Sequence, residues 1–365
     1  MKPYHYCPEC LLPNTHPNTK FDEDGICLAC KNYKKRKEID WKRREEELRI
    51  ICDSYRTKNN FSCVIAVSGG KDSTFITKIL VEDMKMNPLL ITVADPFTKT
   101  QAGIHNLNNL KERFNCDTLV YEIGRKTFRK ATRHAFEKLG EPLKYIEYAI
   151  YTIPYKIAEH MGIKLVFFGE NSAYEYGYTD NQQLYNEHII DNLLENVDVD
   201  FWKEVLDDTE MYPINKMYET HWSKLLFMSY FYPWSSVKHY EIAKKYGFKD
   251  LCGEWDDRKG TFENFEQIDS VSYSIHLWMK FCKLFFARTT DIVSRRIREG
   301  YMTIEEGKKL ILEHDHLLDN KSLEDFINFC GYTKNEFYTI VGKFWDRDIF
   351  ERDQNEQWKP KINRF

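Results

Sequence analysis

Residues 63–73 read CVIAVSGGKDS, in which five apolar residues lead directly into a polar loop. A short continuous apolar run of this kind is typical of a parallel β-strand that is covered on both faces. The apolar residues that follow, at Phe75, Ile76, Ile79 and Leu80, have the spacing of one face of a helix. The segment therefore predicts a strand, a tight loop and a helix in succession.

The same alternation of apolar runs and helical patterns continues as far as residue 168. We expect strands at 89–93, 118–121 and 164–168, and helices at 100–114, 126–139 and 148–161. Regular alternation of strands and helices predicts an α/β fold with a doubly wound parallel sheet. Ligands of such sheets bind beyond the carboxyl ends of the strands, where the loop at 68–73 should lie.

The 365 residues are expected to form three regions. Residues 1–55 predict a cysteine-bearing unit with a linking helix over the charged stretch 31–50. Residues 56–262 predict the sheet domain, with 172–262 as an irregular, Tyr- and Trp-rich lid or insertion. Residues 263–365 predict a helical C-terminal region that includes an amphipathic stretch at 270–299.

Composition limits the classes of function. Apolar residues make up 42 % of the chain, which excludes a wholly disordered protein. The 53 Lys and Arg residues are outnumbered by 57 Asp and Glu residues, so the charge opposes a general nucleic-acid coat protein. No run of about 18 apolar residues is present, and the first residues do not resemble a signal peptide. We therefore expect a cytoplasmic protein with no membrane partner.

Four of the ten cysteines form two C-x2-C motifs, at Cys7 and Cys10 and at Cys27 and Cys30. Two such motifs at this separation are typical of a tetrahedral zinc site. A cytosolic environment opposes disulfides. We expect structural Zn²⁺, while an iron–sulfur cluster, which also takes four thiolates, stays open as an alternative.

The loop at 68–73 carries the groups that bind a polyphosphate. Glycines let the backbone approach an anion, and the N-terminus of the following helix attracts negative charge. A lysine and two serines add donors, and an aspartate can act through Mg²⁺; these residues are Ser68, Gly69, Gly70, Lys71, Asp72 and Ser73. A plain strand-to-helix turn would explain the glycines and a serine cap, but not the lysine and aspartate together. The GxxxxGKS/T and GxGxxG nucleotide motifs do not occur.

This hexapeptide resembles the pyrophosphate loop (PP-loop) of the ATP pyrophosphatase superfamily, which implies cleavage of ATP to AMP and pyrophosphate. The cysteine motifs, the segments 169–171 (GEN) and 175–177 (EYG), and the late segment 288–300 resemble one branch more closely. That branch is the N-acetyl sugar amidotransferase family of bacterial surface-polysaccharide (lipopolysaccharide) and nonulosonic-acid biosynthesis. A nucleotide-linked diacetamido uronic acid and a nonulosonic acid such as pseudaminic or legionaminic acid would both suit as its sugar.

The resemblance implies that the acetamido oxygen of a sugar attacks the α-phosphate of ATP. Ammonia then displaces AMP from the O-adenylyl imidate and leaves an acetamidino group. The sequence has no G-x-C-x-G glutaminase motif, and Lys2 rather than a cysteine follows Met1. The resemblance therefore implies ammonia from a separate glutaminase subunit with a barrel-shaped companion. ATP, Mg²⁺ and structural Zn²⁺ are the expected small ligands.

Sheet topology and the resemblance together select the remaining site candidates. The catalytic candidates are Lys71, Asp72 and Glu170, and Asp95 joins the loop as a candidate for ATP binding. The substrate candidates are Asn171, Glu175, Tyr176, Arg288 and Asp291. Four of them have a structural alternative: a helix cap or a solvated loop for Glu170, a strand-end turn for Asp95, and an ordinary helix pair for Arg288 with Asp291.

Two other functions stay open. Several PP-loop enzymes modify tRNA by thiolation or lysidine formation and carry cysteine sites, and the basic stretch 31–49 suits RNA. The acidic pI near 6.3 and the aromatic lid oppose this function. The other alternative is a non-catalytic zinc docking module on a degenerate sheet.

Overall fold

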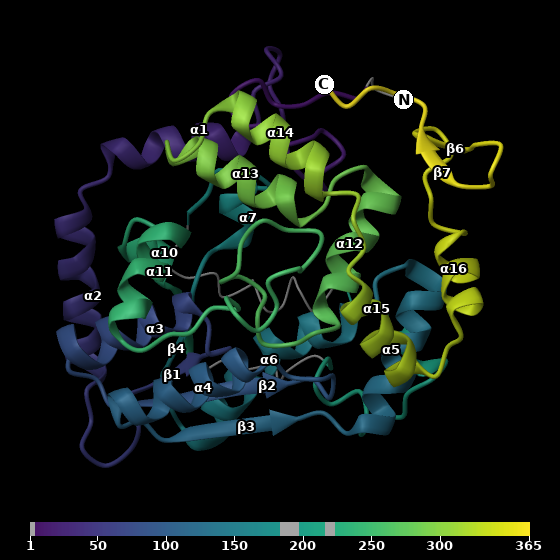
Figure 1. Cartoon of the computed structure of the whole chain (residues 1–365). Coiled ribbons are helices and arrows are strands. Elements are labelled where there is room, and N and C mark those ends of the chain that lie inside the picture. Colours follow the sequence, from purple (N-terminus) through teal and green to yellow (C-terminus); the bar gives the residue numbers. More distant parts are fainter. Residues whose placement is uncertain (1–3, 183–196, 216–222) are drawn as a thin grey trace.

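The structure is a computed structural model that describes residues 4–182, 197–215 and 223–365. Its centre is a five-stranded, all-parallel sheet in the order β3-β2-β1-β4-β5 (Figure 1). The strands are β1 (Cys63–Ala66), β2 (Pro88–Ala94), β3 (Thr118–Glu122), β4 (Leu165–Phe168) and β5 (Lys224–Phe227). The predicted doubly wound α/β fold is confirmed.

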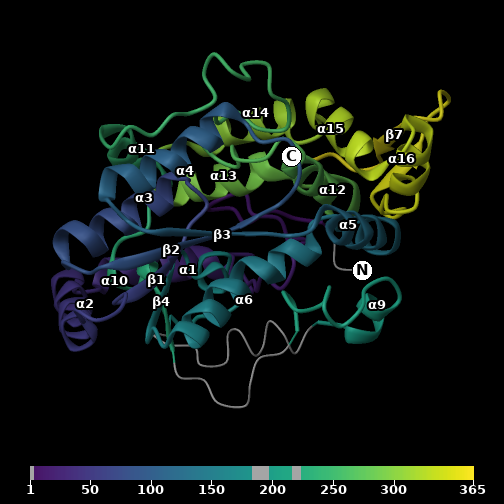
Figure 2. The ribbon, with the colours of Figure 1, turned by 90° about the horizontal axis from the view of Figure 1, so that it is seen from below.

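Helices connect the strands close to where the sequence predicts them. They are α3 (Lys71–Lys78), which continues into the π-helical turn η2 (Ile79–Asp83), then α4 (Gln101–Phe114), α5 (Arg125–Leu139) and α6 (Lys144–Met161). The last of these begins four residues before the predicted start at 148. Helix α6 lies on the opposite side of the strands from α3 and α4 (Figure 2).

Alternate strand residues enter two separate cores. Val64 and Val166 pack with the apolar faces of α5 and α6. Ile65 and Phe167 pack with α3, α4 and an earlier helix, α2 (Trp41–Tyr55). Side chains of a strand point alternately to its two faces, so a strand buried on both faces must be apolar throughout, as residues 63–67 are.

The expectation of an irregular lid over 172–262 is wrong for part of that stretch. It supplies the fifth strand, β5, whose Leu226 pairs with Phe167 of β4. The apolar signal of β5 is only a few residues long, which is too short to separate from loop residues by pattern alone. The other elements here are α7 (Ser172–Glu175), α9 (Val199–Lys203), α10 (Met228–Phe231) and α11 (Ser236–Lys245). Residues 183–196 and 216–222 of the expected lid lie outside the described residues.

The single helix expected over 31–50 is also wrong. The chain forms α1 (Leu28–Lys35), a 3₁₀ turn η1 (Arg36–Glu38) and then α2. The break occurs because Asp40 caps α2, its carboxylate accepting a hydrogen bond from the backbone N–H of Arg43 at 3.1 Å. Aspartate is among the strongest N-cap residues, and a cap marks a new start.

The C-terminal region is helical, as expected, and ends in a small hairpin. Its elements are α12 (Tyr273–Leu284), α13 (Arg288–Arg298), α14 (Ile304–His314), α15 (Asn320–Cys330), α16 (Lys334–Val341), β6 (Phe350–Arg352) and β7 (Trp358–Pro360). The amphipathic stretch 270–299 is two helices, because Phe285 adopts a left-handed conformation (φ 62°) that ends α12. Both termini lie on one side of the molecule (Figure 1), where Arg364 donates a hydrogen bond to the Tyr6 hydroxyl at 2.8 Å. None of the described helices has the length and apolarity needed to cross a lipid bilayer.

Candidate active site

The loop between β1 and α3 borders a cavity of about 370 Å³ at the carboxyl ends of β1, β2 and β4. Gly69 has φ +81°, and a Cβ there would lie 2.9 Å from the backbone nitrogen of Leu107. The Ser73 hydroxyl accepts a hydrogen bond from the Ser68 backbone N–H at 3.0 Å, which braces the loop. The first N–H groups of α3 have no acceptor within their own helix. The loop is therefore built to offer backbone donors to an anion.

Lys71 and Asp72, the predicted catalytic pair of the loop, contact each other and line the cavity. The Lys71 Nζ lies 2.9 Å from Oδ2 of Asp72. Burial alone would lower the pKa of the Lys71 ammonium, but Asp72 and Glu266 raise it above its ordinary value. Burial would raise the pKa of Asp72, yet Lys71 and His239 hold it below its usual range. Both groups are therefore charged at neutral pH.

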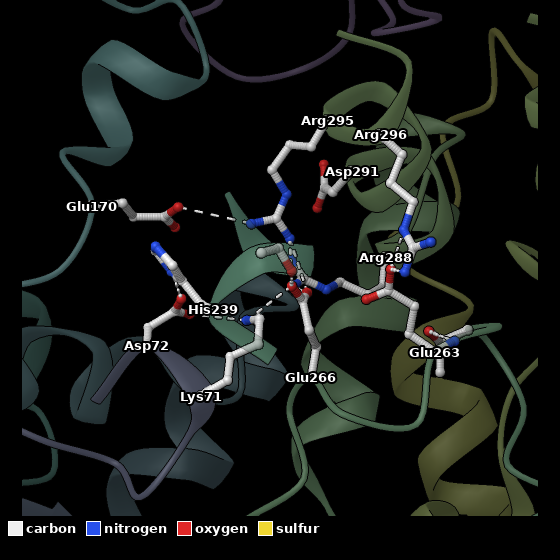
Figure 3. Close-up of polar contacts among 12 residues, drawn as sticks. Lys71, Asp72, Glu170, His239, Glu263, Glu266, Arg288, Asp291, Arg295 and Arg296 are labelled. Carbon is white, nitrogen blue, oxygen red and sulfur yellow. Dashed lines mark hydrogen bonds and ion pairs between the residues drawn. The ribbon is translucent and has the colours of Figure 1, made fainter. Parts of the chain in front are cut away.

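A buried carboxylate, Glu266, gathers the cations of this cavity (Figure 3). It pairs with Lys71 at 3.1 Å, with the Arg295 Nη2 at 2.8 Å, and with Arg288. Burial would raise the pKa of Glu266, but Arg295, Lys71 and Arg288 hold it well below its usual range. Asp72 also pairs with Lys71, and Glu170 lies 3.8 Å from Arg295, so the three cations are balanced by three carboxylates. Lys71, Arg288 and Arg295 nevertheless offer charged donors to a polyanion beside the loop.

Other carboxylates line the same cavity. Glu170, predicted on the ligand side of the sheet, lies there with its Oε2 3.8 Å from Arg295. Asp95 also lines the cavity, and its carboxylate accepts hydrogen bonds from Lys99 at 2.7 Å and Ser270 at 3.1 Å. Glu147 adds a third carboxylate; burial would raise its pKa, but His276 at 3.0 Å lowers it to about 2. The cavity thus has anionic as well as cationic walls.

Four of the five substrate candidates are not among the described residues that line this cavity. Asn171 caps α7, since its Oδ1 accepts a hydrogen bond from the Tyr174 backbone N–H at 3.3 Å. Glu175 forms a buried ion pair with Arg36. The fifth candidate, Arg288, does line the cavity.

The remaining two candidates meet at the N-terminal unit. Tyr176 stacks on the ring of His16, with 5.1 Å between centroids, and burial raises the pKa of Tyr176 to about 12. Asp291 is buried between His16 and Lys280, each at 3.5 Å, and does not pair with Arg288 as a simple helix pair would. The roles of these four residues in substrate binding stay predictions.

The four predicted cysteine ligands converge, with all ligand atoms within 4.8 Å of one another. The Sγ atoms of Cys7 and Cys30 are 3.8 Å apart, and those of Cys10 and Cys27 are 3.5 Å apart. A tetrahedral site with Zn–S bonds of about 2.3 Å places its sulfurs roughly 3.8 Å apart, so the set fits zinc.

The cysteine unit packs directly on the elements that carry cavity residues. Arg298, at the end of α13, donates a hydrogen bond to Cys10 Sγ at 3.4 Å. Gly177, in the loop beyond Glu170, lies so close that a Cβ there would come within 2.5 Å of the Ala29 nitrogen. The cysteine unit therefore packs against both α13 and the loop after β4.

Four residues of the site are missing from the sequence-based candidates: Glu147, Glu266, Arg295 and His239. Arg295 is seven residues after Arg288, a spacing that places both on one face of a helix, and this could have identified it. Glu266 lies in a loop and His239 on the short α11, and neither belongs to a recognisable motif. Only the fold brings them to the loop at 68–73.

Comparisons with known proteins bear on the C-terminal region first. Residues 259–363 match the family described as LPS biosynthesis protein WbpG-like, C-terminal domain. A curated protein, the uncharacterized protein MJ1599 of Methanocaldococcus jannaschii, is 24 % identical over 149 residues, which cover 41 % of this chain and 52 % of that protein. The chain therefore matches about half the length of this relative.

Three solved structures also resemble the chain. NH3-dependent NAD synthetase from Campylobacter jejuni is 17 % identical, with a TM-score of 0.30, covering 46 % of this chain and 78 % of that one. NMN synthetase from Francisella tularensis is 12 % identical, with a TM-score of 0.36 and coverages of 82 % and 96 %. The U34-tRNA thiolase NcsA from Methanococcus maripaludis, with its 4Fe-4S cluster, is 12 % identical, with a TM-score of 0.35 and coverages of 81 % and 85 %. Likeness at this level says nothing about what this chain binds.

The loop and the C-terminal match meet in one cavity, since Arg288 and Arg295 both lie within residues 259–363. The sheet, the hexapeptide at 68–73 and the four-cysteine cluster complete the architecture. The chain thus joins a parallel α/β sheet and a PP-loop-like hexapeptide to a C-terminal segment, residues 259–363, that matches the WbpG-like family of LPS biosynthesis proteins.

Proposed function

We propose that this chain is an ATP-dependent amidotransferase that converts an acetamido group of a bacterial sugar into an acetamidino group. One observation carries the proposal: the PP-loop Lys71 and the α13 residues Arg288 and Arg295 meet around Glu266 in one cavity. Helix α13 belongs to the segment that matches an LPS biosynthesis family, which supports a sugar as the acceptor. The candidate sugars are a nucleotide-linked diacetamido uronic acid and a nonulosonic acid such as pseudaminic or legionaminic acid.

In the first step the acetamido oxygen attacks the α-phosphorus of ATP. An O–P bond forms, the P–O bond to the β-phosphate breaks, and pyrophosphate leaves. The N–H groups of the loop, with Lys71 and Arg288, are placed to neutralise the charge that grows on pyrophosphate. Bound Mg²⁺ would supply further neutralisation of the phosphates, and Asp72 is the residue that would hold it.

In the second step ammonia attacks the imidate carbon, the C–O bond breaks, and AMP leaves with the former acetamido oxygen. The product is an amidinium cation. Glu170 lines the cavity with 31 % of its side chain exposed, so it can accept a proton from an entering ammonium ion. The neighbouring Glu147 carboxylate is ionised at neutral pH and favours a cationic product.

The proposed source of ammonia is a separate glutaminase subunit with a barrel-shaped companion. The sequence supports this, because it contains no G-x-C-x-G nucleophile motif. Structural Zn²⁺ is the proposed occupant of the cysteine cluster, whose sulfur separations fit it. Full activity of the isolated chain with glutamine alone would contradict the partner.

The test is incubation of the purified chain with ATP, Mg²⁺, ammonium and candidate N-acetyl sugars, followed by mass spectrometry. Replacing the amide oxygen by NH lowers the mass by about one unit and adds a cation at pH 7, because an amidine is a stronger base than lysine. AMP and pyrophosphate should appear in equal amounts with the product. AMP formation without any change in sugar mass would reject the acceptor.

Variants make the test specific to this cavity. Lys71→Ala and Arg288→Met should each lower AMP formation by at least about 100-fold, as expected when one preorganised charge is removed from a transition state. Lys130→Ala is the matched control, because Lys130 pairs with Glu210 at 2.6 Å and is not among the described residues that line the cavity. Equal activity of Lys71→Ala and the control would reject the proposed site.

RNA modification is a second candidate function, and one groove favours it. A groove of about 270 Å³ is lined by aromatic and cationic side chains, namely Tyr33, Arg36, Lys37, Trp41, Trp234, Lys238 and Tyr301, with Pro233, Ser235 and Glu299. Aromatic rings beside cations are the usual means of binding single-stranded nucleic acid. Binding of tRNA that weakens steeply with salt and is lost in Trp41→Ala would favour this function.

A further inference from the structure

His239 reaches the PP-loop from a helix far away in the sequence. Its Nδ1 lies 2.6 Å from Oδ1 of Asp72, and its side chain is 2 % exposed. The imidazole stacks on Phe75, with 4.0 Å between centroids, and meets the Trp234 ring edge-on at 4.4 Å. Two aromatic contacts therefore hold the imidazole in one orientation against Asp72.

The position of this aromatic pair is itself fixed by the sheet. A Cβ on Gly169, the residue after β4, would lie 3.1 Å from Trp234, so the ring packs against the strand end. His239 appears between the carboxylates of Asp72 and Glu170 in the close-up (Figure 3). The imidazole is thus anchored to the same strand end that presents Glu170 to the cavity.

The hydrogen bonds determine which nitrogen of His239 carries its proton. An ionised carboxylate can only accept, and the pKa of Asp72 is held below its usual range, so Nδ1 donates. The other nitrogen, Nε2, is buried and has no hydrogen-bond partner among the described residues. A proton on Nε2 would be a buried donor with no described acceptor, so the geometry places the shared proton on Nδ1, toward Asp72.

The two carboxylate oxygens of Asp72 accept hydrogen bonds from two different side chains. Oδ1 accepts from His239 at 2.6 Å and Oδ2 accepts from Lys71 at 2.9 Å. Without His239 the carboxylate could rotate and chelate the Lys71 ammonium with both oxygens. That arrangement would occupy the Lys71 donors, which the polyphosphate needs, and would turn Asp72 away from any bound cation.

We propose that His239 is a positioning residue that fixes the Asp72 carboxylate and thereby keeps Lys71 available to a nucleoside triphosphate. The proposal rests on the proposed function, because it assigns Asp72 and Lys71 to ATP. His239 does not line the cavity, so it acts through Asp72 and not on the substrate. It predicts effects on MgATP and none on the acetamido sugar.

The test compares three substitutions with different donors. In His239→Asn the amide nitrogen lies near the place of Nδ1, whereas in His239→Gln it lies near the place of Nε2. His239→Phe keeps the aromatic stack without a donor. We expect His239→Gln and His239→Phe to weaken MgATP binding and to lower kcat/KM for MgATP by about 10- to 100-fold, the cost of a misplaced catalytic group.

His239→Asn should remain within about 3-fold of the wild type, because it restores the hydrogen bond to Asp72. The KM for the sugar should change in none of the three. MgATP binding is measured by calorimetry, so that one readout does not require turnover, and thermal unfolding is recorded for each variant. If the Phe variant does not fold, the Asn and Gln pair decides alone.

Equal MgATP affinity in all variants, or an Asn variant as weak as Gln, would overturn the role of His239. A wild-type chain that binds MgATP but transfers no nitrogen would overturn the proposed reaction instead, and the binding series would still judge His239. A wild-type chain that does not bind MgATP would overturn both.

Discussion

The loop at 68–73 and the helix α13 contribute to the same cavity, yet they are built in different ways. The loop takes its groups from one hexapeptide and braces itself through the Ser68 to Ser73 hydrogen bond. Helix α13 is held from outside: Glu266 pairs with two of its arginines, and Arg298 contacts Cys10. The conformation of the loop is therefore set by residues close together in the sequence. The cavity wall that Arg288 and Arg295 form (the α13 wall) depends instead on tertiary packing with the N-terminal unit.

The largest effect is expected when one cysteine of the proposed metal site is replaced. Cys10→Ser should forfeit several kcal/mol of the metal-binding free energy, on the order of 5 kcal/mol, since structural zinc contributes about 10–16 kcal/mol in isolated zinc fingers. Hydrogen exchange should then show loss of protection in α13, whereas α3 keeps its protection. Metal content is measured in parallel by elemental analysis.

Cys52→Ser is the control for this variant, because Cys52 is equally buried but belongs to the sheet core and not to the cluster. It should lose stability without losing metal and without a selective effect on α13. If Cys10→Ser lost its metal while α13 stayed as protected as α3, the wall would not depend on the cysteine unit.

The next largest effect is expected for Glu266→Gln. This change leaves Lys71, Arg288 and Arg295 without their shared buried anion, and breaking a buried ion pair in this way costs about 3–5 kcal/mol. The measurement is the free energy of unfolding in urea. The double variant Glu266→Gln with Arg288→Met should recover part of the loss, and no recovery would mean that charge pairing is not the cause.

A pair of glycines tests how much the loop depends on the close packing around Gly69. Gly69 and Gly162 both have positive φ, at +81° and +67°. A Cβ added at Gly69 would lie within 4 Å of the backbone of Leu107, whereas a Cβ added at Gly162 would meet nothing within 4 Å. Gly162→Ala should cost about 1 kcal/mol for its left-handed conformation, and Gly69→Ala about 2–3 kcal/mol because the clash is added. MgATP affinity should fall only in Gly69→Ala, and equal losses in both variants would contradict the crowding of the loop.

The smallest expected effect is on the stability of the protein in acid, through Asp291 of α13. Burial would raise the pKa of Asp291, but Lys280 and His16 hold it below its usual range. The folded protein therefore keeps Asp291 ionised at a pH where the unfolded chain binds a proton, so stability falls as the pH decreases below about 4. Asp291→Asn should reduce the slope of the unfolding free energy against pH by up to about 1.4 kcal/mol per pH unit, measured by denaturation between about pH 5 and pH 3. An unchanged slope would mean that Asp291 is not charged in the folded state.

The difference between the loop at 68–73 and α13 also explains which site residues could be predicted from the sequence. The strands, the loop and the cysteine cluster are local patterns, so residues 63–73 and the two C-x2-C motifs are recognisable before folding. Glu266 and His239 have no such pattern. They become site residues only because the chain returns to the loop after more than 160 residues, as the separation of 167 between Asp72 and His239 shows.

The candidates just after β4 illustrate the opposite error. Glu170 and Asn171 are adjacent, and sheet topology predicts that both lie on the ligand side. Only Glu170 lines the cavity, because Asn171 turns inward to cap α7. A topological rule can place a segment at the strand ends, but side-chain direction depends on local hydrogen bonds that the rule does not contain.

The contact between Arg298 and Cys10 spans 288 residues of sequence. A ribosome that adds about 5–20 residues per second needs roughly 15 to 60 seconds to make that interval. During this time four thiols have emerged while the helix that shelters them does not yet exist. Oxidants and competing metal ions therefore reach the cysteines before folding protects them. The yield of correctly loaded protein in an expression host should thus depend on the supply of the bound metal, proposed to be zinc, and on reducing conditions during translation, more than on how the finished chain is purified.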